Sequence, residues 1–204
     1  MHHAGSPSWE VRIDRWSQRY DVPLWIRAVE RIDVPADGIV PGPLEDDVLP
    51  PRGSAVEVDA AHELVEGWVA WWSAVVGQAR VVDFTAPPTA DPYDPPGFSG
   101  LARWSALQQL VQSRWPEIRE WNLARKSGGI RDGLHIDGQI NSTIRELEQG
   151  LGRSSRPFVL DLVLLPVRDD RIRRVGSARY LVPECLWDGA RSSAAVRELL
   201  SPLV

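Results

Sequence analysis

Phe158-Val159-Leu160-Asp161-Leu162-Val163-Leu164-Leu165 is the stretch that decides the fold class. Seven of its eight residues are apolar and would face both sides of an extended chain, which predicts a strand at the centre of a sheet. The turn-forming run Arg168-Asp169-Asp170-Arg171 follows, and Ile172 to Val182 is long enough to return beside the strand. The sequence therefore predicts a β-hairpin over about residues 157–182.

Two segments near the start of the chain also show extended patterns. Trp9 to Asp14 alternates apolar and charged residues, which is the period of a half-exposed strand. The segment from Leu24 to Val34 fits a strand or a helix, because Asp21 and Pro23, which come just before it, are typical of a helix start. Its later residues favour the strand, and the helix stays open as the alternative.

Four segments are expected to be helical. The clearest runs from about Asp59 to Gln78, is apolar over most of its circumference and is rich in tryptophan, so we expect it to be the central helix. The others are expected from Ser99 to Gly128 with a kink or restart at Pro116, from Asp137 to Gln149, and from Ser192 to Leu200. Strands and helices follow no regular β-α-β rhythm, so we expect an α+β fold with a mostly antiparallel sheet, packed with three to five helices.

The composition is that of a globular chain. With 204 residues, 43% of them hydrophobic, the sequence predicts a single domain over residues 1–204, with proline-rich surface loops at about 35–53 and 86–97. No run approaches the ~18 apolar residues of a membrane span, and the first residues lack a signal-peptide pattern, so we expect a cytoplasmic protein without membrane contact. Cys185 is the only cysteine, which excludes an internal disulfide.

Arginine and tryptophan are over-represented. Of the 23 basic residues, 22 are arginines, which we interpret as the GC-rich codon usage of a bacterium. The chain has ten tryptophans spread along its length, which favours a role in the core for most of them, but ten are many for one small core, so we expect a few to be exposed as interface anchors. Residues 1–99 contain 7 arginines and 16 acidic residues, a net charge of −9, and this acidic half argues against binding to nucleic acid.

Two pairs of residues could bind a metal ion. His62 and Glu66 lie one turn apart on the first expected helix, although a zinc-protease motif would have histidine where this chain has Glu66. An exposed, charged helix start explains this pair equally well. His135 and Asp137 lie in a glycine-flanked loop and could act as a general base, or Asp137 could simply cap the next helix.

Asp161 is the one carboxylate in the expected central strand. A charge in an apolar strand is costly unless it is paired or hydrogen-bonded. The hairpin register would place it opposite Ala178, with Tyr180 or Arg174 as a partner. We expect Asp161 to be largely buried with such a structural partner, and a catalytic carboxylate is the alternative.

Two sets of residues are expected to contact a partner protein. The first consists of the tryptophans that we expect to be exposed, Trp9, Trp16, Trp104 and Trp121. The second consists of three arginines in the expected hairpin, which would contact an acidic surface: Arg171, Arg173 and Arg174.

The function predicted from these features is binding rather than catalysis. The sequence contains no Gly-x-Ser-x-Gly elbow, no dinucleotide fingerprint and no phosphate-binding loop. We therefore interpret the chain as a non-catalytic cytoplasmic bacterial protein, a binding, adaptor or immunity-type partner of another protein, with no cofactor. The alternative is a metal-dependent hydrolase or nuclease that uses His62, Glu66, His135, Asp137 and Asp161.

Overall fold

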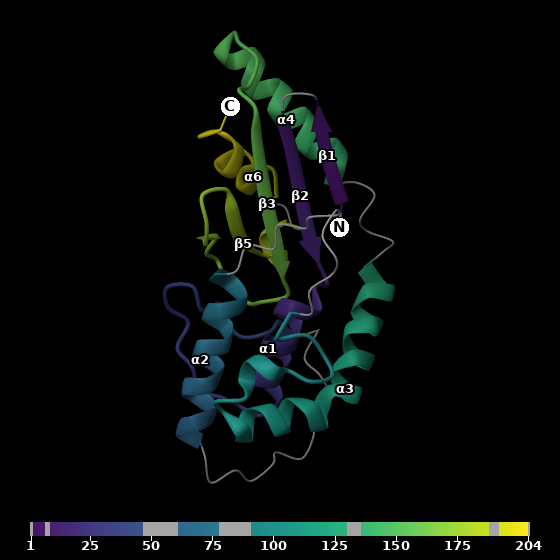
Figure 1. The fold of residues 1–204 in the computed structure, drawn as a ribbon. Coiled ribbons are helices and arrows are strands. Elements are labelled where there is room, and N and C mark those ends of the chain that lie inside the picture. Colours follow the sequence, from purple (N-terminus) through teal and green to yellow (C-terminus); the bar gives the residue numbers. More distant parts are fainter. Residues whose placement is uncertain are drawn as a thin grey trace. The chain divides into compact units, whose positions relative to one another are not determined.

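The computed structural model describes residues 2–6, 9–46, 61–77, 91–129, 136–187 and 192–203. For residues 2–6, 61, 129, 136–139 and 192 this description covers the backbone alone. The chain divides into two compact units, which are treated separately below (Figure 1). Residues 1–16 and 126–204 form one, named here the sheet unit, and residues 17–125 form the other, named the helical unit.

The sheet unit contains a mixed five-stranded sheet. Its strands are β1 (His2–Ser6), β2 (Trp9–Arg15), β3 (Phe158–Leu165), β4 (Arg173–Arg174) and β5 (Arg179–Pro183), in the order β1-β2-β3-β5-β4. The central pairs β2–β3 and β3–β5 are parallel, and the outer pairs β1–β2 and β4–β5 are antiparallel. The α+β class and the central position of β3 are therefore confirmed, whereas the prediction of a mostly antiparallel sheet is wrong.

The predicted hairpin over residues 157–182 is the source of that error. β3 and β5 run parallel, and the hairpin joins β4 to β5 instead, closed by a hydrogen bond from Val175 N to Arg179 O. Both the 168–171 run and Gly176-Ser177-Ala178 are rich in turn-forming residues, and the second run makes the turn. Between β3 and β5 lie the roughly dozen residues that a parallel connection requires.

The core of the sheet unit lies between one face of the sheet and two helices. These are α4 (Ile136–Leu151) and α6 (Ser192–Leu200), and the short helix α5 (Glu184–Trp187) follows β5. Alternate residues of the strands supply the sheet side of this core, as the period of two requires. The buried cluster contains Trp9, Val11, Ile13, Leu160, Leu162, Leu164 and Val182 from the strands, and Ile140, Ile144, Val196 and Leu199 from α4 and α6.

The helical unit contains helices α1 (Gln18–Val29), α2 (Ala61–Gly77) and the part of α3 (Ser105–Gly129) that precedes Lys126, with a 3₁₀ turn at Ser99–Leu101. The strand expected from Leu24 to Val34 is wrong, because residues up to Val29 are helical. Every residue from Tyr20 to Ile26 is buried, so this helix shows no polar stripe that would reveal its period. α3 runs through Pro116 as one helix. Over the described residues there are six α-helices, rather than three to five.

Stacked aromatic rings fill the core of the helical unit. Trp68 and Trp72 of α2 are parallel with centroids 5.7 Å apart, and Tyr20 of α1 meets Trp72 edge to face. Both of these buried indoles donate their N–H to backbone carbonyls, Trp68 to Pro23 and Trp72 to Ile39. The tryptophan-rich helix expected at 59–78 is therefore present as α2, and its tryptophans serve the core.

Ion pairs with little exposure surround α1. Arg19 contacts Asp91 and also donates to the carbonyl of Val75, and Glu30 accepts a hydrogen bond of 2.8 Å from Arg114 of α3. Breaking such a pair would leave a desolvated charge, so these contacts fix how α1 packs in this unit.

Three other expectations concern organisation. The single domain over residues 1–204 stays a prediction. Residues 32–43 contain no helix or strand, in keeping with the loop expected at 35–53. Residues 47–53 of that loop and residues 86–90 of the second expected loop lie outside the described part of the chain. None of the described helices is long and apolar enough to span a membrane.

Candidate partner-binding site

The residues proposed for metal binding are not brought together where the structure describes them. His62 and Glu66 are exposed on the first turn of α2, with Nδ1 and Oε1 3.6 Å apart. His135 lies outside the described residues, and Asp137 is described only as part of the α4 backbone. Within the described residues, no group of three or more histidine, cysteine or acidic side chains could hold a metal ion. The metal-dependent hydrolase stays a prediction without support from geometry.

Asp161 lies in a row of charges on the sheet face opposite the core cluster. Arg12 of β2, Asp161 of β3 and Arg179 of β5 stand in register on three adjacent strands. Asp161 Oδ1 lies 3.9 Å from Arg12 Nη1, and Oδ2 lies 3.5 Å from Arg179 Nη2. Glu10, two residues before Arg12, accepts hydrogen bonds of 2.9 and 3.1 Å from it, which raises the pKa of the Arg12 guanidinium.

This row corrects the expectations for Asp161. Its side chain is 28% exposed rather than largely buried, and its register partner is Arg179 rather than Ala178. The partners are Arg12 and Arg179, not Tyr180 or Arg174. Because the ion pairs are long and partly solvated, the row stabilises the fold by about 1 kcal/mol or less.

The expected exposure of four tryptophans is only partly met. Trp9 is 7% exposed and stacks on Phe158, so its indole is a core residue rather than an anchor. Trp16, Trp104 and Trp121 are half-buried, so part of each indole reaches solvent. Each of these three rings also has an arginine guanidinium within 5.5 Å of its centroid, from Arg15, Arg103 and Arg125 respectively.

The Trp121 pair is the best defined of the three. Arg125 lies one turn after Trp121 on α3, and its guanidinium carbon is 4.9 Å from the ring centroid. Arg125 Nη1 also donates to Asp21 Oδ2 of α1 at 2.7 Å. The same oxygen accepts a 2.6 Å hydrogen bond from Asn122 Nδ2. We name Asp21, Trp121, Asn122 and Arg125 the α3 anchor.

Burial makes the α3 anchor rigid. Asp21 is 1% exposed and Asn122 is 3% exposed, so neither side chain can exchange these contacts for water. The charge-assisted bond to Asp21 fixes Arg125, and Arg125 in turn covers one face of Trp121. The result is a half-exposed indole with a fixed orientation, which is a surface suited to binding an apolar or aromatic group rather than to chemistry.

Sequence reasoning identified Trp121 but missed its supports. Asp21 was assigned only to a helix start, and Asn122 carried no signal, because a single polar residue inside a helix is most often solvated. The spacing of Trp121 and Arg125 was the one available clue, since residues four apart share a helix face.

Trp104 packs closely against α2. An added Cβ on Gly67 would lie 2.8 Å from Trp104 Cγ, so glycine is needed for this approach. The guanidinium carbon of Arg103 lies 5.5 Å from the centroid of the Trp104 ring, and Arg103 is itself exposed. In the sheet unit, Arg15 lies over Trp16 and also forms an ion pair with Glu184 at 3.3 Å. These pairs resemble the α3 anchor but contain fewer described supporting contacts.

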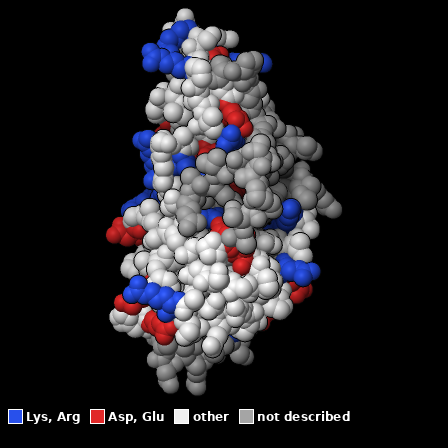
Figure 2. All heavy atoms as spheres, viewed as in Figure 1, with Lys and Arg blue, Asp and Glu red and all other residues white. Residues whose placement is uncertain are grey.

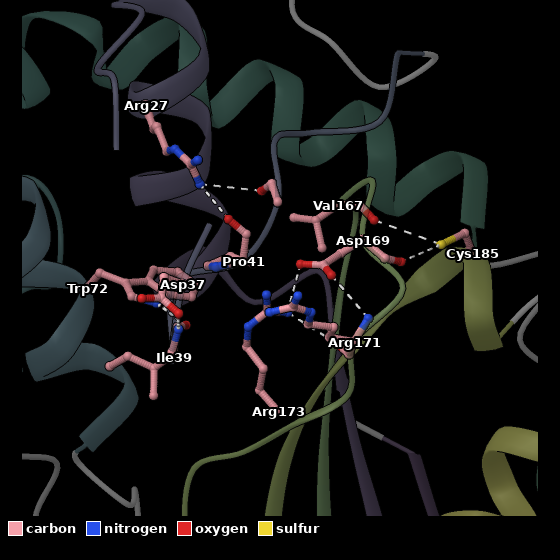
Figure 3. Close-up of polar contacts among 12 residues, drawn as sticks. Arg27, Asp37, Ile39, Pro41, Trp72, Val167, Asp169, Arg171, Arg173 and Cys185 are labelled. Atoms are coloured by element: carbon pink, nitrogen blue, oxygen red, sulfur yellow. Dashed lines mark hydrogen bonds and ion pairs between the residues drawn. The ribbon is translucent and has the colours of Figure 1, made fainter. Parts of the chain in front are cut away.

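The three arginines expected to contact an acidic partner differ in availability. Arg173 is 8% exposed and pairs with Asp169 at 2.7 Å, so its charge is neutralised within the sheet unit (Figure 3). Arg171 and Arg174 are exposed, and Arg174 donates to the carbonyls of Gly176 and Ser177. A role in partner binding stays a prediction for Arg171 and Arg174, and the buried Arg173 is a structural residue.

Charges of both signs are mixed on the visible surface. On the face drawn in Figure 2, acidic and basic side chains form small neighbouring groups rather than one large area of a single sign. Binding of nucleic acid normally requires a continuous basic surface, and that face does not present one.

Comparison with known proteins adds no functional information. No protein family model, no curated protein and no solved structure matches this chain. The argument for a function therefore rests on the α3 anchor and its surroundings.

Proposed function

We propose that this protein is a non-catalytic binding partner of another protein, of the adaptor or immunity type, and that the α3 anchor is part of its contact surface. The observation that carries the proposal is the half-exposed Trp121, fixed by Arg125 and by the buried Asp21. Tryptophan and arginine are the residue types most enriched among those that dominate binding energy at protein interfaces.

Rigidity is the second argument for this surface. Association costs free energy for every side chain that must be ordered, and a side chain that is already ordered avoids that cost. Indole has only two side-chain torsions, and here a hydrogen-bonded guanidinium lies over the ring.

The surroundings of Trp121 indicate a partner with an apolar contact point. The Arg125 charge is already compensated by Asp21, so the anchor offers little net attraction to an acidic group. We therefore propose a partner that places an aliphatic or aromatic side chain against the indole.

Quantitative co-purification tests this proposal. The wild-type protein and a Trp121→Ala variant are expressed with an affinity tag in the source cells, and co-purifying proteins are quantified by mass spectrometry. Glu120→Ala is the matched control, because Glu120 is the exposed neighbour on the same helix.

We expect one protein to co-purify stoichiometrically with the wild type and with Glu120→Ala, and to be depleted at least tenfold by Trp121→Ala. Circular dichroism and urea titration must show that Trp121→Ala stays folded. A partner retained by folded Trp121→Ala, or no stoichiometric partner with any of the three proteins, would refute the proposal.

A further inference from the structure

A cavity in the helical unit lies between the end of α1 and the segment that follows it. Its volume is 420 Å³, within the range of small-molecule sites. Its walls are largely apolar, and three of its lining residues are charged: Arg27, Arg31 and Asp33. The apolar lining residues are Leu24, Ala28, Ile32, Val34, Pro43 and Leu44.

Arg27 differs from the other arginines of the helical unit that have little exposure. Arg19, Arg114 and Arg125, with side chains 9%, 13% and 8% exposed, each form an ion pair with a carboxylate. Arg27 is bonded to backbone carbonyls instead: Nη1 to Pro41 at 2.7 Å (Figure 3), and Nη2 to Val34 at 2.7 Å. Within the described part of the chain, no carboxylate lies within ion-pair distance of its guanidinium.

The Arg27 charge is thus compensated only by backbone carbonyls and by the Trp68 ring, whose centroid lies 5.3 Å from the guanidinium carbon. Burial lowers the pKa of the Arg27 guanidinium, and the carboxylate of Asp33 opposes this only from a distance. Its guanidinium has five N–H donors, and the carbonyls of Val34, Pro41 and Gly42 are its described acceptors. A bound anion in the cavity would use the remaining donors and supply the missing charge.

Arg31 adds a second cation at the same cavity. It lies just beyond α1 with a φ of 53°, a conformation that is uncommon for a residue other than glycine. Its side chain is exposed, and no group in the described residues bonds to its guanidinium. The two arginines outnumber Asp33, so the charged residues of the cavity sum to one positive charge.

The end of α1 does not oppose an anion here. Unpaired carbonyls at a helix C-terminus would repel one. In α1 the carbonyl of Ile26 accepts from the N–H of Glu30, and that of Arg27 accepts from the N–H of Ile32. Both carbonyl oxygens therefore already accept a hydrogen bond from the backbone.

We propose that this cavity binds a small organic monocarboxylate, with its carboxylate between Arg27 and Arg31 and its apolar body against Leu24, Val34 and Leu44. A single carboxylate matches the net charge of the cavity, whereas a phosphate would bring a second charge into an apolar site at a higher desolvation cost. The residues of this site are separate from the α3 anchor, so the two proposals stand or fall independently.

Titration with hexanoate tests the proposal, with uncharged hexanamide as the matched ligand. Binding is followed by NMR of leucine and valine methyl groups at constant ionic strength, up to about 10 mM ligand, which covers millimolar dissociation constants. We expect saturable shifts of Leu24, Val34 and Leu44 with hexanoate, and at least tenfold weaker binding of hexanamide.

Variants separate specific from nonspecific binding. Arg31→Ala removes an exposed cation without disturbing described contacts and should weaken hexanoate binding several-fold. Arg119→Ala removes an exposed arginine of α3, which does not line the cavity, and should leave the affinity unchanged. Three results would each overturn the proposal: no saturable shifts, equal binding of hexanamide, or equal effects of the two variants.

Discussion

Removal of Asp21 should destabilise the protein more than any surface charge change, because Asp21 connects α1 to α3. The side chain is 2% exposed, and its Oδ2 accepts from Arg125 at 2.7 Å and from Asn122 at 2.6 Å. Asp21→Ala leaves a guanidinium that is only 8% exposed without its carboxylate, which costs about 3–5 kcal/mol. Asp21→Asn keeps an acceptor but removes the charge, and should cost roughly 1–2 kcal/mol.

A double-mutant cycle isolates this interaction from side-chain packing. Asp21→Ala, Arg125→Met and the double variant are unfolded in urea, and the free energy of unfolding is followed by circular dichroism. Because Arg125→Met removes the unpaired charge, we expect the double variant to lose at least about 1–2 kcal/mol less than the sum of the two single losses. Additive losses, or an Asp21→Ala loss below about 1 kcal/mol, would show that Asp21 does not support the α3 anchor.

Two further predictions concern packing and acid stability. Gly67→Ala should lower the free energy of unfolding by about 1–3 kcal/mol, because the new Cβ would lie 2.8 Å from Trp104 Cγ. The control Gly77→Ala meets nothing within 4 Å and should be neutral or slightly stabilising. Equal urea midpoints for the two variants would contradict this prediction. Hydrogen bonds from the N–H and hydroxyl of Ser155 lower the pKa of the Glu148 carboxyl group. The ionised Glu148 therefore stabilises the fold above the ordinary glutamate pKa of about 4.3, and this stabilisation is lost as the pH falls through the lower pKa of the folded state. Glu148→Gln should therefore flatten stability against pH in this acid range, and an unchanged profile would refute the assignment.

Local patterns in the sequence predicted the elements better than their pairing. The limits of β3 and α6 were predicted correctly, because an uninterrupted apolar run and a helical period are local properties. Strand direction is not local: β3 pairs with β2, nearly 150 residues earlier, and with β5 after a crossover. The Asp161–Arg179 register was therefore beyond prediction from the turn residues alone.

The same distinction applies to the candidate site. Trp121 was identified by residue type, and Arg125 shares its helix face. Asp21, however, is 101 residues from Asn122 in sequence, so only the packing of α1 against α3 brings the two together. Trp9 shows the opposite error, since residue type alone could not show that its ring stacks on Phe158 inside the sheet core.

The central claim is that the α3 anchor binds another protein. The most direct test is to measure how tightly the purified partner binds the wild-type protein and the Trp121→Ala variant. Isothermal titration gives both dissociation constants, with Glu120→Ala as the control. A central aromatic anchor is worth about 2 kcal/mol or more, so we expect Trp121→Ala to weaken binding at least about 30-fold and Glu120→Ala to change it less than about threefold. Equal affinities of a folded Trp121→Ala and the wild type would contradict the account.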